Sequence, residues 1–327
     1  MRRSRAALLV VASATVVACR AAPFYEQTYL RASHNWEFRA RYPAADHLLN
    51  AFDYGHAILY ETLIAHRSDS RVILDRDQFD FIVDTLLVHP PSVPLDEAAV
   101  GPHYVQLVPE VHAMFDWAHM LHRQLYDVWA DPRITDSQKD VRVAEAVRYY
   151  KSRRDLAFSS RPKSMSLMEG APYSLAFRKR CPTFNGLIWS YHWMQMAMYD
   201  GLIAGADERA RVANVAEVLK RFRAMLEDAP TRLPGTMPMT PAIAPRFAAR
   251  YPEASIIFDN LHSLHDVVSD VLASPVVPDS KKREAILRAA AAYRDDTTAI
   301  MTVAEWRGMA AMMGVERMGG VAFPQRK

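Results

Sequence analysis

The chain has 327 residues, of which 50% are hydrophobic, so it is long enough to bury a sizeable core in one large or two moderate domains. Its 40 Lys and Arg residues exceed its 37 Asp and Glu residues by three. Three arginines, Arg2, Arg3 and Arg5, lie at the extreme N-terminus, and the remaining chain is formally neutral. This balance removes the electrostatic argument for a nucleic-acid partner. A low glycine count, 11, favours helix.

The N-terminus is predicted to be an export signal. Its arginines precede an apolar run over residues 6–17, which is too short to span a bilayer as a stable helix. The run ends in Val16-Val17-Ala18-Cys19. This segment resembles the lipobox of bacterial lipoproteins, in which the signal is cut before a Cys that becomes lipidated. The resemblance implies a signal peptide over residues 1–18, a lipidated Cys19 and a lipid-anchored protein on the periplasmic side of the cell envelope. The alternative is an ordinary secretory signal, cleaved near Ala18 or Ala22.

Residues 19–32 are predicted to be a linker into a first helical repeat, residues 33–152. Its helices are expected over residues 46–66, 75–88, 109–130 and 137–152, with a Pro-rich loop over residues 89–109. The first is apolar and aromatic along its whole length, which predicts a largely buried helix. The third begins with Pro and Glu, a favourable arrangement at a helix N-terminus, and stops at Pro132.

Residues 153–171 connect to a second predicted repeat, residues 172–327, whose tail from residue 314 is expected to be irregular. Its helices are expected over residues 185–205, 207–228, 252–274 and 280–295, with a loop over residues 229–252. No strand alternation is present that would predict a sheet. If Cys19 is lipidated, Cys181 is the only free thiol, so the exported body must be held by its core, a ligand or a metal.

The two predicted repeats match each other directly in sequence. Residues 115–139 and 258–282, at an offset of 143, share 12 identities in 25 positions, and residues 38–64 and 177–203, at an offset of 139, share 8 in 27. A self-match at a nearly fixed offset indicates two copies of one unit. We therefore predict an all-α, internally duplicated domain in which two pseudo-symmetric multi-helix repeats form a bundle.

One repeated motif carries most of the predicted chemistry. Asp116, His119 and His122 recur as Asp259, His262 and His265. Residues three apart lie on one face of a helix, so each Asp and the first His can bind one metal ion together. Glu61 and its counterpart Asp200 add a carboxylate to each of the two apolar helices.

The resulting order is acid, then acid-x-x-His, then acid, then acid-x-x-His. It resembles the ligand order of the ferritin-like di-iron and di-manganese carboxylate proteins. The resemblance implies single or bridging carboxylates at Glu61 and Asp200, and paired ligands at Asp116, His119, Asp259 and His262. The sequence departs from that pattern in three ways: the paired acids are Asp, each pair is followed by a further His (His122, His265), and the loops are long. The implied metal is Fe or Mn, with Zn or Cu also open.

A rival ligand set lies on the apolar helices themselves, at Asp53, His56 and His192. Glu61 is rotated by about 80° from Asp53 on an ideal helix, so the two sets do not easily face one centre. A third interpretation is structural, because a buried Asp beside a His often forms a closed hydrogen-bonded pair.

Three functions therefore remain open from the sequence. The first is a metal-dependent oxidoreductase acting on O₂ or peroxide, with Tyr60 or Tyr199 near the centre. The second is a non-catalytic envelope lipoprotein or subunit of a larger complex, and the third a periplasmic copper or haem binder using the His and Met residues near His192. A small-molecule substrate and a protein complex both remain open as partners, in addition to the membrane.

The lipid anchor gives the first testable prediction. Cys19→Ser removes the only thiol that can be lipidated at the leader, so the variant is expected to leave the membrane fraction and appear in the soluble fraction. Cell fractionation with immunodetection measures this, and a wild-type protein that is never found with membranes would show the anchor prediction to be wrong.

Overall fold

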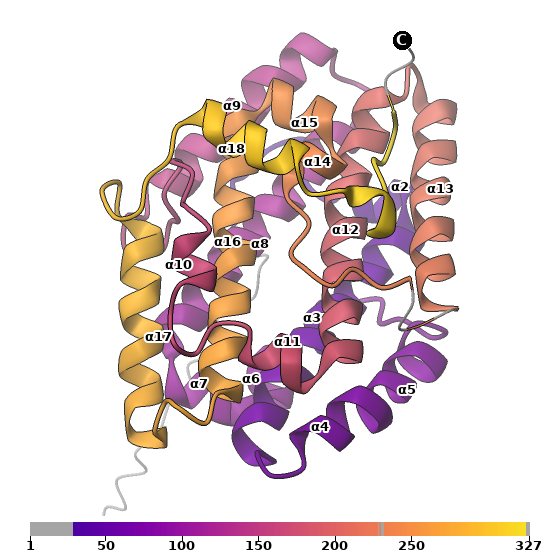
Figure 1. Cartoon of the computed structure of the whole chain (residues 1–327). Coiled ribbons are helices and arrows are strands. Elements are labelled where there is room, and N and C mark those ends of the chain that lie inside the picture. The colour runs from indigo at the N-terminus through magenta and orange to yellow at the C-terminus, as the bar shows by residue number, and fades with distance from the viewer. Residues whose placement is uncertain (1–28, 228, 230–231, 325–327) are drawn as a thin grey trace, which may run out of the picture.

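Four long helices lie at the centre of the computed structural model, which describes residues 29–227, 229 and 232–324. They are α3 (Pro43–Ala65), α8 (Pro109–Ala130), α12 (Pro182–Ala204) and α16 (Pro252–Ala273). Each begins with Pro, whose missing N–H costs nothing in the first turn of a helix. Helices α3 and α8 each contact both α12 and α16 (Figure 1), so side chains from all four helices meet in one core.

A second group of helices covers this centre. Helix α9 (Asp136–Lys151) packs on α8, α17 (Asp279–Arg294) on α16, and α13 (Glu208–Leu226) on α12. Figure 1 shows α17 beside α16 and α13 beside α12. The helix predicted over residues 75–88 instead begins at Ser70 and alternates between α and π geometry: α4 (Ser70–Val72), η1 (Ile73–Gln78), α5 (Phe79–Phe81) and η2 (Ile82–Leu86).

Short helices occupy the segments between the long ones. They are α2 (Glu37–Arg41), α6 (Glu97–Val100), α7 (Pro102–Leu107), α10 (Ser166–Glu169), α11 (Ala176–Arg180), α14 (Thr240–Ile243), α15 (Pro245–Arg250), α18 (Val303–Ala311) and the 3₁₀ turn η3 (Val315–Arg317). The prediction of plain loops over residues 89–109 and 229–252 is therefore wrong. The prediction interpreted proline as a sign of a loop, whereas Pro102 and Pro245 lie in the first turn of helices.

The all-α prediction is confirmed for the described residues, in which the only strand-like pairing is an isolated bridge between Lys163 and Ile300. Helices of equal length recur at the offsets of the sequence match. Helices α3 and α12 each have 23 residues, α8 and α16 each have 22, and α9 and α17 each have 16. Among the described residues, no helix is both long enough and apolar enough to cross a membrane. The predicted signal peptide and Cys19 lie outside the described residues.

Two buried carboxylates fix the short helices that precede α3 and α12. Asp127 Oδ1 accepts a hydrogen bond from the backbone N–H of Phe38 (3.0 Å), and Asp270 Oδ1 accepts one from the backbone N–H of Phe177 (2.8 Å). Asp270 Oδ2 also accepts from the N–H of Leu175 (2.6 Å). These N–H groups lie at helix N-termini, where they have no partner within the helix, so the carboxylates serve as remote caps.

Two buried lysines close the other end of the motif helices. Lys139 Nζ donates to the carbonyls of Val128 and Asp131 at the end of α8. Lys282 Nζ donates to the carbonyl of Val271 (3.1 Å), with further carbonyls of the last turn of α16 nearby. A cation is favourable there because the terminal carbonyls are unpaired and carry the negative end of the helix dipole.

The capping role of Asp270 gives a stability prediction. Asp270→Ala leaves two backbone N–H groups of the chain entering α11 without an acceptor, so the free energy of unfolding is expected to fall by about 1–3 kcal/mol. Denaturant unfolding measures the change. Asp155→Ala is the matched control, because Asp155 lies on the surface and caps no helix, and an equal effect of the two variants would contradict the capping role.

Candidate metal centre

Six histidines meet where the four long helices cross. Helix α3 contributes one, α8 two, α12 one and α16 two, and all are buried, with exposed fractions from 0% to 6%: His56, His119, His122, His192, His262 and His265. The rings lie close to one another, with centroids 4.3 Å apart for the pair His56 and His265 and 4.4 Å apart for the pair His192 and His262. The two sequence-predicted sets therefore contribute histidines to a single cluster.

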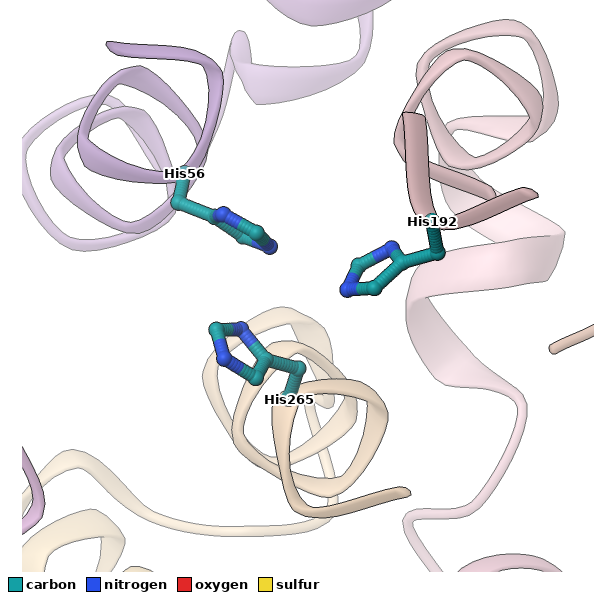
Figure 2. A group of neighbouring side chains, drawn as sticks. All are labelled: His56, His192 and His265. Carbon is teal, nitrogen blue, oxygen red and sulfur yellow. The ribbon is translucent and has the colours of Figure 1, made fainter. Parts of the chain in front are cut away.

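Three of these histidines form the tightest group. One ring nitrogen from each of His56, His192 and His265 lies within 4.8 Å of the others, a spacing that could hold one metal ion. The three side chains come from three different helices, α3, α12 and α16, and their rings converge (Figure 2). This triad combines two members of the rival set with one member of the repeated motif.

Hydrogen bonds set the orientation of two of the three rings. Nδ1 of His192 lies 2.8 Å from the carbonyl oxygen of Ile188, which can only accept, so Nδ1 carries the proton and Nε2 has the lone pair. Nδ1 of His265 lies 2.9 Å from the hydroxyl of Tyr60. A ring held through one nitrogen, with the other directed to the centre, is the usual arrangement of a metal-binding histidine.

The remaining nitrogens of the triad have no hydrogen-bond partner. They are Nε2 of His192, Nε2 of His265 and both ring nitrogens of His56, all fully buried. An unsatisfied buried polar atom costs about 1–3 kcal/mol of stability. Three such side chains around one point are therefore unfavourable unless something binds them.

Burial also keeps the imidazoles neutral. Loss of solvation lowers the pKa of His192 to about 3 and that of His119 to about 4. The same cause, followed by repulsion from neighbouring histidines, holds the pKa values of His56 and His265 well below 6.5. A neutral imidazole is the form that binds a metal ion, so the triad is in its ligating state at neutral pH.

The histidine His122 has surroundings like those of His265. The hydroxyl of Tyr199 donates to the backbone carbonyl of His122 (3.0 Å), so the neighbouring Nδ1 of that ring donates to the same hydroxyl oxygen (2.9 Å). The His122 ring stacks on Phe258, with centroids 3.4 Å apart. Both tyrosines predicted to lie near the centre, Tyr60 and Tyr199, thus contact it through a histidine.

Two carboxylates predicted as single or bridging ligands instead bind short helices. Glu61 accepts hydrogen bonds from the backbone N–H of His103 (3.0 Å) and from its ring, at the start of α7. Asp200 accepts from the backbone N–H groups of Arg246 (2.8 Å) and Phe247 (3.1 Å) and from the Arg246 guanidinium, at the start of α15. Their repetition in the sequence is explained by the repetition of this capping contact.

The carboxylates of the repeated motif are also engaged away from the histidine triad. Asp259 Oδ1 accepts from the N–H (2.9 Å) and hydroxyl (2.7 Å) of Thr240, and its Oδ2 accepts from the indole of Trp306 (2.7 Å). Asp116 lies beside His112, with Oδ2 3.5 Å from Nδ1. Of the rival set, Asp53 is bound by the guanidinium of Arg123 (2.9 Å).

The sequence does not predict a second group, formed by Glu97, His112 and Asp116, although it predicts Asp116 as a metal ligand. Its ligand atoms also lie within 4.8 Å of one another and could hold a metal ion. Here, however, each ring nitrogen of His112 faces a different carboxylate, Nε2 towards Glu97 (3.2 Å) and Nδ1 towards Asp116. Burial lowers the pKa of His112, but Glu97 and Asp116 outweigh it and raise the value to about 9. The positive charge of His112 between two acids balances this group electrostatically, although Nε2 of His112 and Oε2 of Glu97 form no hydrogen bond.

Because the buried imidazoles are neutral, the stability of the protein should depend on pH, and the variant His119→Gln measures the contribution of one of them. The pKa of His119 is lower in the folded protein than in the unfolded chain, so the folded state binds fewer protons between about pH 4 and pH 6.5. Metal-free wild-type protein should therefore lose stability relative to His119→Gln as the pH falls through this window, by about 1.4 kcal/mol per pH unit.

Urea unfolding at several pH values measures this difference. The comparison with a variant is needed because buried carboxylates with raised pKa values, such as that of Asp127 (about 7), act in the opposite direction in both proteins. His66→Gln is the control, since His66 is exposed and contacts water in both states. A difference between wild type and His119→Gln that stays constant with pH would contradict the prediction.

No protein-family model, curated protein or solved structure matches this chain, so its function must be inferred from the geometry of the histidine centre.

Proposed function

We propose that the protein binds one transition-metal ion through His56, His192 and His265. The observation that carries this proposal is the convergence of three buried, neutral imidazoles, each with at least one ring nitrogen that has no hydrogen-bond partner. A bound metal ion would supply the missing partner for all three at once. Within a buried site it provides a Lewis acid or, for copper, a one-electron couple.

The main rival is a buried polar network without a metal, and the chain contains its own comparison. At the sequence offsets, the counterparts of His56, His192 and His265 are Gln195, Asp53 and His122. Gln195 Oε1 lies 3.1 Å from Nε2 of His262, and Asp53 is bound by Arg123. The counterparts of His56 and His192 thus pair their side chains within the chain, whereas His56 and His192 leave ring nitrogens unpaired; His122, like His265, keeps an unpaired Nε2. This contrast supports a ligand site over a closed network.

The donor set favours some metals over others. Imidazole suits Zn²⁺, Cu²⁺, Ni²⁺ and Fe²⁺, whereas Mn²⁺ prefers carboxylate oxygen. Because the acids Glu61, Asp116, Asp200 and Asp259 bind other groups, the carboxylate-bridged di-iron or di-manganese chemistry loses its bridging ligands. We therefore propose Zn²⁺ or Cu²⁺ at a mononuclear site. Three protein ligands leave a fourth position for water or a substrate, as in catalytic zinc sites.

Tyr60 has a positioning role in this proposal. Its hydroxyl lies 2.9 Å from Nδ1 of His265 and so holds the orientation of that ring. Burial holds the pKa of Tyr60 well above 10, so its hydroxyl stays protonated and neutral. Partners of this kind orient a ligand ring and typically contribute about 10–100-fold to metal affinity.

We also propose that the metal protein is exported and lipid-anchored, and that its two halves are copies related by a pseudo-twofold axis. The leader sequence alone supports the first statement. Equal helix lengths at the offsets of the sequence match support the second.

Metal binding by the triad is testable on the purified protein. One equivalent of Zn²⁺ or Cu²⁺ per chain is expected by mass-spectrometric metal analysis and calorimetric titration. His56→Gln, His192→Gln and His265→Gln should each weaken binding by at least about 100-fold, because each removes a ligand rather than an outer contact. At 1,000 times the Kd, the metal should raise the stability of the wild type by about 4 kcal/mol.

His262→Gln is the matched control for these variants. His262 lies on α16 like His265, is equally buried and belongs to the same cluster, but it is not part of the triad. Its loss should change metal affinity by less than about tenfold, within the range of an outer contact. Sub-stoichiometric metal in the wild type, or equal losses in His262→Gln and His265→Gln, would contradict the assignment of the triad.

A further inference from the structure

A cavity of about 390 Å³ lies at the end of α16 and the start of α17, beside α11 and the C-terminal end of α3. Its wall carries three cations, Arg67, Arg180 and Lys282, and one carboxylate, Asp279. The rest of the wall is formed by apolar side chains, among them Leu272, and by Ser70 and Ser274. A volume of this size falls in the range of small-molecule sites, which combine an apolar lining with a few polar groups.

The cations are held in place by the chain. Arg180 Nε donates to the hydroxyl of Ser70 (2.8 Å), and its Nη2 donates to the backbone carbonyl of Arg67. Lys282 is fixed by the terminal carbonyls of α16, and burial followed by repulsion from Arg67 and Arg180 lowers its pKa to about 8. Arg67 forms an ion pair with Asp279, while its Nε is buried without a hydrogen-bond partner. Three positive charges thus face a single carboxylate.

The corresponding place in the first half of the chain is filled. Residues 129–139 are the counterpart of residues 272–282, and there the large ring of Trp129 stands where the second half has Leu272. The guanidinium groups of Arg211 and Arg250 lie 5.7 Å and 4.9 Å from the Trp129 ring centroid. An indole and two arginines therefore occupy this place in the first half.

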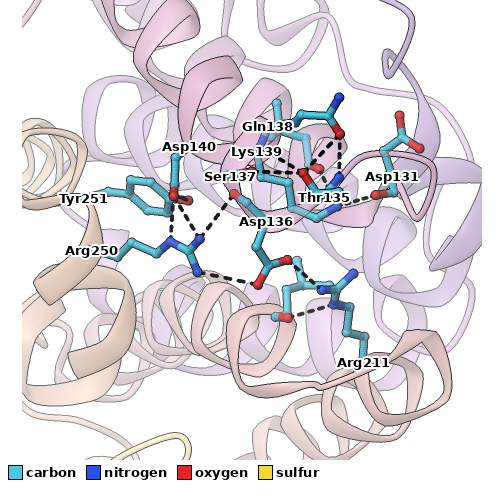
Figure 3. A network of polar contacts seen from close by, with 12 residues as sticks. Asp131, Thr135, Asp136, Ser137, Gln138, Lys139, Asp140, Arg211, Arg250 and Tyr251 are labelled. Atoms are coloured by element: carbon cyan, nitrogen blue, oxygen red, sulfur yellow. Dashed lines mark hydrogen bonds and ion pairs between the residues drawn. The ribbon is translucent and has the colours of Figure 1, made fainter.

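The charges of the first half are also balanced (Figure 3). Asp136 contacts Arg211 (3.4 Å) and Arg250 (3.8 Å), and Asp140 binds Arg250 (2.7 Å). The counterpart of Asp140 is Arg283, so the second half lacks this carboxylate and has an additional cation in its place. Arg283 turns away to Glu110 on α8. The second half therefore has open space where the first half has the Trp129 indole, and it lacks a carboxylate corresponding to Asp140.

The N-terminus of α17 also carries less compensation for positive charge than the N-terminus of its counterpart α9. Helix α9 begins with a complete capping box, in which Thr135 and Gln138 satisfy each other's backbone N–H groups. Helix α17 has Pro278 at the N-cap, which has no side chain able to cap. Pro278 and Asp279 line the cavity, so the positive end of α17 adds to the charge of the arginines.

We propose that this cavity binds a small organic anion, with its carboxylate or phosphate group held by Arg67 and Arg180 and its apolar part packed against Leu272. Arginine suits this role because its planar guanidinium binds carboxylate and phosphate oxygens in pairs. The anion supplies the negative charge that Asp140 provides in the first half, and its apolar part occupies the space of the Trp129 ring. This site is separate from the metal centre and does not depend on it.

Calorimetric titration of the full chain with hexanoate, hexyl phosphate, inorganic phosphate and hexanol tests the proposal. Hexanoate or hexyl phosphate should bind at least about tenfold more tightly than hexanol, the neutral analogue, because charge-assisted hydrogen bonds are lost with the charge. The tighter of the two anions identifies the head group. If hexanol bound as tightly as the anions, the role of the cations would be wrong. If inorganic phosphate bound as tightly as hexyl phosphate, the role of the apolar wall would be wrong.

Two variants connect binding to the cavity. Leu272→Trp fills the cavity with the indole ring that the first half has at Trp129. Arg67→Gln removes a cation whose ion-pair partner is the exposed Asp279. Each variant should weaken binding of the tighter anion by at least about tenfold. Arg288→Gln, an exposed site further along α17, is the control and should change affinity less than about twofold. Thermal unfolding checks that each variant folds. Unchanged binding in a folded Arg67→Gln variant, or no binding of either organic anion to the wild type, would overturn the proposal.

Discussion

The loss of solvation around six imidazoles is the constraint on which the centre of this protein depends. Histidine is tolerated in a core when each ring is neutral and its polar atoms are paired. Here burial holds the rings neutral, and tyrosine hydroxyls, a glutamine and a backbone carbonyl pair some of the nitrogens. Each of the six rings keeps at least one unpaired nitrogen, and the close spacing of His56, His192 and His265 is what would let one metal ion bind three of these rings at once.

The carboxylates of the same four helices have a different task. A helix that leaves the core exposes unpaired N–H groups at its start, and a carboxylate on a neighbouring long helix can bind them from a distance. Asp127, Asp200 and Asp270 each do so, which fixes the short helices against the long ones. The long helices thus present imidazoles to the centre and carboxylates to the segments that surround it. The short capped helices in turn determine where α3 and α12 begin.

The helices could be predicted from the sequence because their signals are local. Continuous apolar content, Pro at the first turn and a direct self-match locate all four long helices to within a few residues. The ligand set could not be predicted in the same way. On an ideal helix, Asp116 and His119 differ in direction by about 60°. That rotation places the His119 ring in the core and the Asp116 carboxylate at the edge of the bundle. Only the three-dimensional structure shows that Asp116 lies beside His112 and Glu97. The rule that residues three apart share a face is too coarse to decide ligation.

The relation between the two halves sharpens this point. Positions that repeat, such as Asp127 with Asp270, Lys139 with Lys282 and Glu61 with Asp200, make the same kind of capping contact in each half, so their repetition follows from the repetition of the helices. Two histidines of the triad break this pattern, because the counterparts of His56 and His192 are Gln195 and Asp53, whereas His265 repeats as His122. The cavity beside α17 also arises where the halves differ, at Leu272 in place of Trp129. The repeated carboxylates and lysines thus satisfy the needs of the fold, whereas the repeated His122 and His265 each also leave Nε2 unpaired. Open space remains where the halves differ, at Leu272, and the triad joins two differing positions, His56 and His192, to a repeated one, His265.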